Sequence, residues 1–397
     1  MATKSQDVNP EFLQMKQPAA SQAGPIVQTG EGTWLGWPTK TVEPASLTDK
    51  KGRVYRVRTP IMEIEGPLVP TELFYAVQHF KAPEPIPLDQ WALTVDGEVK
   101  RPLRLSYDDL RRYPARTVRT VMECSGSDAD FFEYARGERE RPSRTKEGMI
   151  LSAGEFTGAP LAAILEEAGL TGRAVSVRAE GVDRGVPSND AEHPPFNYDK
   201  AVPIEKALHP DTILAWAQNG KILEHLHGAP ARLLVPGWSG NWSVKWLRRL
   251  EVLDNPGNCY YHYNFYYYGE SPDDPNKELV TTIGVKSIVT SPKDDSPTLP
   301  RGRHAIRGFA WSGAAEIAGV EVSVDDGQTW HAAHVEEPRE RWMWVRWSYI
   351  WDAREAGTYR IMSRAIDQIG RVQPLVPRYN NMRKNFNAVV ANEVTIM

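Results

Sequence analysis

A short stretch rich in proline and aspartate, residues 271–276 (SPDDPN), separates two parts of the chain that have different hydrophobic patterns. Such a cluster of turn-forming residues marks a boundary between folding units. Short strand patterns alternate with helical ones before it, and the pattern after it is all-β. With 397 residues, and about 150 residues per domain, at least two domains are expected. We predict an N-terminal arm over residues 1–54, a first domain over 55–278 and a second domain over 279–397.

The first part mixes strands and helices without the regular alternation of a doubly wound sheet, which predicts an α+β fold. Residues 61–64 and 91–95 have the apolar patterns of strands. Apolar residues at i, i+3, i+4 and i+7 over residues 161–168, followed by Gly169, predict a helix. Ser106 is a typical helix-capping residue and predicts another helix start.

The second part has the pattern of a β-sandwich. Valines at 320, 322 and 324 alternate with polar residues and are followed by Asp326 and Gly327, a pair that suits the positive φ angles of a tight hairpin turn. Residues 359–361 begin another alternating strand. Six of the 13 tryptophans lie between residues 311 and 351, and we expect them between two packed sheets.

Charge and cysteine content exclude several classes of function. Lys plus Arg number 47 against 51 Asp plus Glu, a net charge of -4 that offers no basic surface to nucleic acid. The two cysteines, Cys124 and Cys259, are too few for a disulfide framework, a zinc ribbon or a Cys-x-x-Cys-His haem site. No apolar run approaches the roughly 18 residues that a membrane span needs.

The first 33 residues are polar, and they contain neither the basic start and apolar run of a signal peptide nor a twin-arginine motif. We therefore expect a cytoplasmic protein, or a periplasmic one from which a twin-arginine leader has been removed. The composition of this segment favours an extended arm that lies over the body, with a functional tail as the alternative.

Cys124 lies where an apolar strand runs into a turn of small residues, 125–127 (SGS). A lone cysteine is most often a small buried hydrophobe. The turn, however, would expose the thiol and let a ligand approach the backbone. A thiolate nucleophile or a ligand to a soft metal needs such exposure, so both interpretations are open from the residues alone.

His227 and Arg232 bracket a Gly-Ala-Pro-Ala turn that leads into an apolar strand, and Lys245 follows soon after. At such a junction the side chains can face one cleft. A single anionic ligand that carries a phosphate would explain all three, and a structural role in the turn is the alternative. A Gly-x-Gly-x-x-Gly motif before a helix and a Walker loop are both missing from the sequence, so ordinary dinucleotides and ATP lack support.

Residues 259–268 (CYYHYNFYYY) form an unusual aromatic run. Its composition predicts a segment that packs one domain on the other. A platform for a partner protein, or a conduit beside a redox centre, is the functional alternative.

From about residue 65 onward the sequence resembles the sulfite oxidase family of molybdenum enzymes. Its first domain contains, in the family's order and spacing, a segment that ends in Gln78-His79, MECSG at 122–126, LAWAQNG at 214–220, HGAPAR at 227–232 and SVKWL at 243–247. The family's immunoglobulin-like dimerisation domain is resembled by FAWSG at 309–313, VDDGQTW at 324–330 and RAID at 364–367. The resemblance implies a sulfite-oxidase-type molybdopterin-binding domain with mixed β-sheets, followed by an immunoglobulin-like β-sandwich.

The resemblance also implies a cofactor and the residues that hold it. The cofactor would be the molybdenum cofactor (molybdopterin, or Moco), which is one molybdenum ion on a single pyranopterin that bears a phosphate. Cys124 would ligate the metal. The implied cofactor-binding residues are His79, Cys124, Asp183, His227, Arg232, Ser243 and Lys245, while Tyr198 and Gln78 would join Cys124 at the catalytic centre.

The implied activity is that of a molybdopterin-dependent oxidoreductase of sulfur metabolism. It would transfer an oxygen atom to sulfite or to protein-bound sulfane sulfur and pass electrons to a cytochrome c-type acceptor. The implied partners are a second copy of the chain, that cytochrome and a sulfur-carrier protein. An enzyme of the same family acting on another neutral substrate, such as an S- or N-oxide, and a non-catalytic dimeric binding protein on this fold are the alternatives.

Some positions depart from the family pattern where sulfite, a dianion, would bind. Gln78 occupies an arginine position, and Asp128 and Ala129 replace a pair of arginines. Phe156 replaces a tryptophan, and another expected arginine is Met382, beside an arginine at 383. Each lost guanidinium removes charge-assisted contacts worth about 1.5–3 kcal/mol.

Plain sulfite should therefore bind weakly unless Arg136, Arg139 or Arg184 reaches the pocket. A less charged substrate, such as sulfane sulfur on a carrier-protein cysteine, fits better. The charged insert at residues 134–147 is expected to form a lid or a partner surface beside that pocket.

Overall fold

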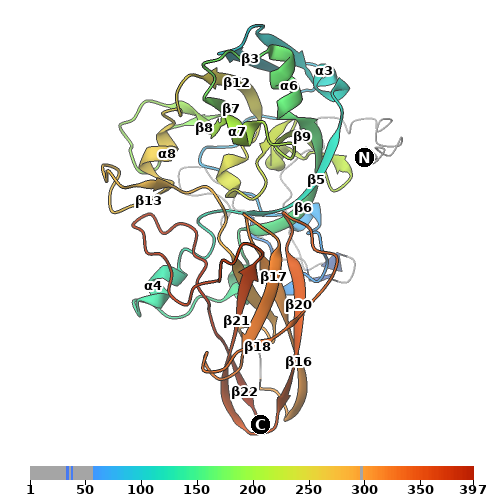
Figure 1. Cartoon of the computed structure of the whole chain (residues 1–397), viewed down its shortest axis with the longest axis vertical. Helices are drawn as coiled ribbons and strands as arrows, with labels where there is room; N and C mark the ends of the chain where they lie inside the picture. The colour runs from blue at the N-terminus through green and yellow to red at the C-terminus, as the bar shows by residue number, and fades with distance from the viewer. Residues whose placement is uncertain (1–32, 35–36, 39–56, 296–297) are drawn as a thin grey trace.

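The computed structural model describes residues 33–34, 37–38, 57–295 and 298–397. Figure 1 shows a broad α+β domain joined to an elongated β-sandwich that carries the C-terminus at its far end. The predicted arm over residues 1–54 lies outside the described residues, except for an antiparallel ladder between β1 (Thr33–Trp34) and β2 (Trp37–Pro38).

Ten strands build the two larger sheets of the first domain: β3 Ala92–Gly97, β4 Leu103–Ser106, β5 Arg116–Glu123, β6 Leu151–Pro160, β7 Ser176–Gly185, β8 Phe196–Pro203, β9 Ile213–Gln218, β10 Lys221–Ile222, β11 Arg232–Leu234 and β12 Leu247–Leu253. One sheet has the order β10-β9-β6-β5, with β11 also paired to β9, and the other has the order β4-β3-β12-β7-β8. The β3–β12 pair is parallel, whereas β5 and β6 pair antiparallel. The sheets are thus mixed, as the α+β prediction required.

Short helices connect the strands: α3 Tyr107–Arg112, α4 Phe131–Ala135, α5 Arg144–Glu147, α6 Leu161–Ala168, α7 Ile204–Ala207 and α8 Tyr260–Asn264. Single 3-10 turns add η2 Ile61–Glu63, η3 Thr71–Leu73, η4 His225–His227 and η5 Gly240–Trp242. None of the helices in the described residues is long and apolar enough to cross a membrane.

The two helix predictions for this domain are confirmed. The Ser106 side chain accepts a hydrogen bond from the Asp109 amide and caps α3, and Gly169 ends α6 with a φ of 69°. The strand predicted over residues 61–64 is wrong, because the backbone there bonds locally: the Glu63 amide donates to the Pro60 carbonyl and forms η2.

The second domain is the predicted sandwich. Its strands are β15 Lys286–Ser291, β16 Gly302–Trp311, β17 Ile317–Ser323, β18 His331–Ala332, β19 His334–Val335, β20 Val345–Ala353, β21 Gly357–Asp367 and β22 Asn392–Ile396. They form two sheets, β15-β16-β20-β19 and β18-β17-β21-β22. A small ladder of β13 (Tyr267–Tyr268) and β14 (Glu278–Leu279) lies between the domains in sequence.

The predicted tight hairpin between β17 and β18 is a longer loop. Asp326 and Gly327 have the expected positive φ angles of 60° and 82°. Val322 nevertheless pairs with His331, so residues 324–330 form the connection between the strands. The reason is local hydrogen bonding, since the Asp325 carboxylate accepts the Thr329 amide at 2.9 Å and holds a wider turn.

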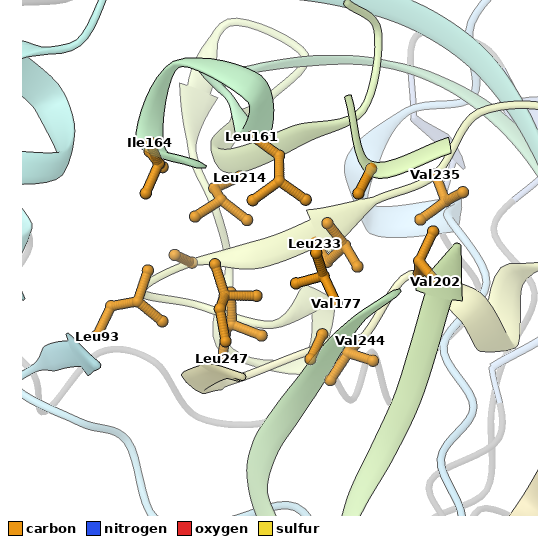
Figure 2. Packing of buried hydrophobic residues seen from close by; sticks show 14 of the residues in the cluster. Leu93, Leu161, Ile164, Val177, Val202, Leu214, Leu233, Val235, Val244 and Leu247 are labelled. Atoms are coloured by element: carbon orange, nitrogen blue, oxygen red, sulfur yellow. The ribbon is translucent and has the colours of Figure 1, made fainter. Parts of the chain in front are cut away.

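Three large hydrophobic cores stabilise the chain. The first lies between the two sheets of the first domain, where Figure 2 shows Leu161 and Ile164 of α6 above Leu214 of β9. The second joins the two domains, and the third fills the sandwich. The expectation that the tryptophans gather between the sandwich sheets is only partly right: Trp347 is in the sandwich core, but residues 311, 342 and 344 belong to the core shared with the first domain.

Candidate functional site

A cavity of about 640 Å³ opens where the first domain meets the C-terminal segment of the second. Its walls come from segments far apart in sequence: residues 74–79, the turn after β5, residues 142–150, η4, residues 240–245, residues 265–266 and residues 382–384. The described chain thus gathers into one cavity most of the motifs that the sequence singled out.

Cys124 lies on the wall of this cavity, directly after β5. Its amide donates to the Ile150 carbonyl at 2.9 Å, and the Ser127 amide donates back to the Cys124 carbonyl at 2.8 Å, which closes the turn. The side chain is half-buried and borders the cavity, which favours the interpretation of an accessible thiol over that of a fully buried residue. Cys259 is buried and lies outside the cavity lining.

His227, Arg232 and Lys245 converge on the same cavity, although they come from η4, from the start of β11 and from the loop before β12. Arg232 donates to the carbonyls of His227 at 2.9 Å and Ser243 at 3.0 Å. Lys245 Nζ donates to Gln78 Oε1 and to a backbone carbonyl, both at 3.0 Å. The Ser243 hydroxyl accepts a backbone amide, so this residue supports the loop.

The buried cations of this cluster lack acidic partners at hydrogen-bonding distance among the described residues. Burial, together with the neighbouring cations Lys245 and Arg232, lowers the pKa of His227 to about 3 and keeps the ring neutral. Burial lowers the pKa of Arg232 to about 10. Burial, reinforced by Arg232, lowers the pKa of Lys245, while burial raises the pKa of Asp183 against the opposing effect of Lys245. Binding of an anion would therefore stabilise the charged forms of these buried side chains.

Several buried polar atoms around this cluster have no partner within the described part of the protein. They are Gln78 Nε2, Asp183 Oδ1, His227 Nδ1, Arg232 Nε and the side-chain amide of Asn241. All five residues line the cavity. Because an unsatisfied buried polar group costs about 1–3 kcal/mol, donors and acceptors that gather around one cavity indicate a polar ligand.

Aromatic side chains form the wall beside this cluster. His79 stacks on Tyr261 with ring centroids 4.0 Å apart, and its Nε2 shares a 2.5 Å hydrogen bond with the Tyr266 hydroxyl. Burial and the nearby cations Lys384 and Lys200 hold the pKa of His79 well below its usual range, so the ring is neutral. Tyr198 lines the cavity, and its hydroxyl donates to the Asn241 carbonyl at 2.8 Å.

The aromatic run over residues 259–268 packs within the first domain, and not between the domains as predicted. Its first half is α8, which packs into the core of the first domain. Phe265 and Tyr266, however, line the cavity. The run therefore contributes to the site through two of its members.

Besides Arg232, three arginines line the cavity, and each is paired with a carboxylate. Arg58 meets Glu147 at 3.1 Å. Arg144 meets Asp128 at 2.8 Å. The third cavity arginine, at position 383, pairs with the Glu133 carboxylate. Each of these three pairs is therefore balanced in charge, although Lys384 also lines the cavity.

Some of the residues that the sequence predicted near the substrate do not line the cavity. Arg136, Arg139 and Arg184 do not reach the cavity: the first pairs with Glu138, the second with Asp130, and the third donates to the Asn197 side chain. Phe156 is fully buried behind the lining and stacks edge-on against Phe74, so it does not act as a pocket wall. Met382 and its neighbour at 383 do line the cavity, as predicted.

Sequence reasoning missed several lining residues. Tyr75, Asn241 and Lys384 lie beside recognised motifs without a residue type that marks a ligand site. Arg58 falls before the recognised segments, and Arg144 lies in the charged insert, whose residues 142–148 form part of the wall. Arg58 and Arg144 are visible in the sequence as charged residues, but the sequence does not indicate which carboxylate each of them pairs with.

The described residues by themselves do not provide a complete metal site. Among the described residues, no group of three or more His, Cys, Asp or Glu side chains could hold a metal ion. A metal at Cys124 would therefore take most of its ligands from a non-protein group, which the unpartnered polar atoms and buried cations of the same cavity could bind.

Comparison with known proteins gives two matches to family models. Residues 79–261 match the oxidoreductase molybdopterin-binding domain, and residues 277–395 match the Mo-co oxidoreductase dimerisation domain.

Individual proteins match over most of the chain. Sulfite oxidase of Gallus gallus is 32% identical over 328 residues, which cover 77% of this chain and 68% of that protein. Nitrate reductase [NADH] 2 of Phaseolus vulgaris is 29% identical over 399 residues, 91% of this chain but 43% of its own length. The chain thus spans less than half of the nitrate reductase. The crystal structure of the sulfane dehydrogenase SoxCD from Paracoccus pantotrophus superposes with a TM-score of 0.74 and 27% identity, covering 98% of this chain and 92% of the other.

Proposed function

Because the chain belongs to the sulfite oxidase family of molybdopterin oxidoreductases, we propose that it transfers an oxygen atom to a sulfur compound and passes the electrons to a cytochrome c-type acceptor. The substrate that fits best is less charged than sulfite, namely sulfane sulfur carried on a protein cysteine. The observation that supports this choice is the pairing of the cavity arginines at 58, 144 and 383 with carboxylates.

The residues of the cavity fit the molybdenum cofactor of the family. Cys124 offers a half-exposed thiol as a soft metal ligand. Arg232 and Lys245 are buried cations that suit the pterin phosphate, and the unpartnered atoms of His227 and Asp183 suit the polar edge of the pterin. When bound, the cofactor supplies the transfer of a water-derived oxygen atom to sulfur, with release of two electrons and two protons.

The chain's own groups would then orient the substrate and limit charge at the site. Tyr198 is held by its bond to the Asn241 carbonyl, and neutral His79 is fixed between Tyr261 and Tyr266. The side chains of Tyr198 and His79 are thus neutral groups held in place by these contacts, in a lining that also contains Lys384. Neutral groups at these positions supply less compensating charge to a dianion than arginines would, which disfavours sulfite.

The substrate assignment is tested on protein produced in a host that makes the molybdenum cofactor. Bound molybdenum is measured first, followed by reduction of cytochrome c with sulfite or with a peptide that carries a cysteine persulfide. We expect a higher kcat/KM for the persulfide than for sulfite. Fast turnover of sulfite at low micromolar KM would contradict the substrate proposal, and molybdenum-free protein would contradict the enzyme proposal.

Replacing Gln78 with arginine should restore affinity for sulfite. A guanidinium at this position adds charge-assisted hydrogen bonds, so the KM for sulfite should fall by about 10-fold. Steady-state kinetics with sulfite measure this. Gln78→Met is the matched control, since it also removes the Gln78 contact to Lys245 without adding charge, and its KM should not fall. An unchanged KM for Gln78→Arg would show that the lost arginine does not set the specificity.

A second candidate substrate class is an oxyanion or N-oxide that is reduced. The similarity to a nitrate reductase over 91% of this chain favours it. Oxidation of a reduced viologen dye by nitrate would identify this activity on the same molybdenum-loaded sample.

The proposed partners are a second copy of the chain, the cytochrome acceptor and a sulfur-carrier protein. The match of residues 277–395 to a dimerisation domain supports the homodimer. Within it, a loop exposes five large apolar side chains, Ile369 65%, Val372 49%, Leu375 58%, Val376 66% and Tyr379 44%. Such a patch is typical of a protein interface.

Introducing charge into this loop should weaken the dimer. We expect the double variant Leu375→Glu and Val376→Glu to shift the mass in solution from dimer to monomer, as measured by light scattering after gel filtration. Leu208→Glu is the control, because Leu208 is 41% exposed on the first domain. A dimer that persists in the double variant would place the interface elsewhere.

A further inference from the structure

The turn that carries Cys124 is bracketed by two buried carboxylates. Glu123 precedes the cysteine at the end of β5, and Asp128 follows the turn with a φ of 58°. Their side chains are 8% and 4% exposed. Both are therefore withdrawn from solvent and need cationic partners.

The second domain supplies the partner that the two carboxylates share. Lys286 Nζ, at the start of β15, lies 2.9 Å from Glu123 Oε1 and 2.8 Å from Asp128 Oδ2, and its side chain is 1% exposed. Trp311 of the second domain donates to the other Glu123 oxygen at 2.9 Å. Arg144 completes the set by pairing with Asp128. The network thus contains two carboxylates and two cations and is balanced in charge.

A third contact joins the same turn to the second domain. The Asn385 amide donates to the Ser125 carbonyl at 2.7 Å. The turn is therefore held before, within and after its small residues by groups that lie beyond residue 280. A backbone turn with this many distant anchors has little freedom to change the direction of the thiol between them.

We propose that Lys286 is a positioning residue for Cys124, so that the second domain is a structural part of the metal centre. The lysine does not touch the cavity, since it is absent from the lining. It acts through Glu123 and Asp128, whose separation it sets by bridging them. This inference rests on the proposed function only in requiring that a molybdenum cofactor binds at Cys124.

The test uses the full-length protein from a cofactor-competent host and does not depend on turnover. Lys286→Met removes the bridge but leaves a buried carboxylate uncompensated, which by itself destabilises the fold. The double variant Glu123→Gln and Lys286→Met keeps the charges balanced, with Asp128 and Arg144 still paired. Molybdenum per chain and the electron paramagnetic resonance spectrum of the half-reduced metal are measured on each, with circular dichroism to follow folding.

We expect the double variant to fold, to retain about 10-fold less molybdenum after dialysis and to show an altered or heterogeneous metal spectrum. Lys293→Met is the matched control, because Lys293 also joins the second domain to a first-domain carboxylate, Glu63, away from the turn. Its metal content and spectrum should equal those of the parent protein.

A folded double variant with the parent's metal content and spectrum would overturn the positioning role. A change of equal size in Lys293→Met would also overturn it, because any interdomain ion pair would then have the same effect. Parent protein that binds molybdenum with a normal spectrum but oxidises no sulfur compound would contradict the proposed function and leave the positioning role standing.

Discussion

Replacing Cys124 with serine is expected to lower turnover by more than about 100-fold while leaving the fold intact. A serine hydroxyl is a poor ligand for a soft metal, whereas the thiolate is a good one. The turn is closed by backbone hydrogen bonds and the side chain is only partly buried against the interdomain core, so the fold should survive the change. Turnover per chain and bound molybdenum, measured beside circular dichroism, test the expectation.

The other cysteine of the chain is the matched control. Cys259 is 1% exposed and lies outside the cavity. Cys259→Ser should therefore keep the turnover of the parent protein even where it lowers stability slightly. Unfolding of Cys124→Ser, or undiminished turnover in it, would instead support the simpler interpretation of Cys124 as a small buried hydrophobe.

Replacing Lys200 with methionine is expected to raise the free energy of unfolding of the metal-free protein by about 4 kcal/mol at pH 7. Lys200 is fully buried, and its Nζ has no hydrogen-bond partner among the described residues. Its Nζ lies 4.9 Å from the Trp242 ring centroid and 4.3 Å from that of Tyr266. These cation–π contacts offset only part of the desolvation cost, which a methionine of similar length does not have.

The size of this gain should depend on pH. Burial lowers the pKa of Lys200 from 10.5 to about 7. Between these values the unfolded chain binds more protons than the folded one, so the penalty of the lysine diminishes as pH rises. The advantage of Lys200→Met is therefore complete below pH 7 and should vanish as pH approaches 10.5.

Chemical denaturation of the metal-free protein at several pH values measures this gain. Lys206→Met is the control, since the Lys206 ammonium also faces two tryptophan rings but donates to the Pro236 carbonyl at 2.8 Å. Removing that hydrogen bond leaves a carbonyl without its donor, so no gain is expected. A Lys200 variant less stable than the parent protein at pH 7 would show that the ring contacts outweigh desolvation.

Much of the fold could be predicted because its signals are local. The capping of α3 by Ser106, the periodicity of α6 and the alternation of β17 all act within a few residues. The two secondary-structure predictions that were wrong failed because other local hydrogen bonds, from the Glu63 amide to the Pro60 carbonyl and from the Thr329 amide to the Asp325 carboxylate, competed with the expected pattern. Residues 61–64 have the composition of a strand but formed η2 against the interdomain core.

The candidate site divides in the same way. The residues Cys124, His227, Arg232 and Lys245 were recognised from their types and order, and the structure brings them to one cavity. The net charge of the part of the cavity where the substrate would bind could not be predicted from the sequence. Arg144 pairs with a residue 16 positions away, and Arg58 with one 89 positions away.

The sequence by itself determined the two-part organisation, the family and the groups available for the cofactor, because residue type and spacing along the chain carry that information. Only the tertiary structure decided which charges remain uncompensated. Lys286 is one lysine among many in the sequence, and its contacts with the two carboxylates beside Cys124 exist because the fold brings the start of β15 to the end of β5. A side chain's electrostatic effect depends on its burial and on its nearest partners in space, and neither is a property of its own segment.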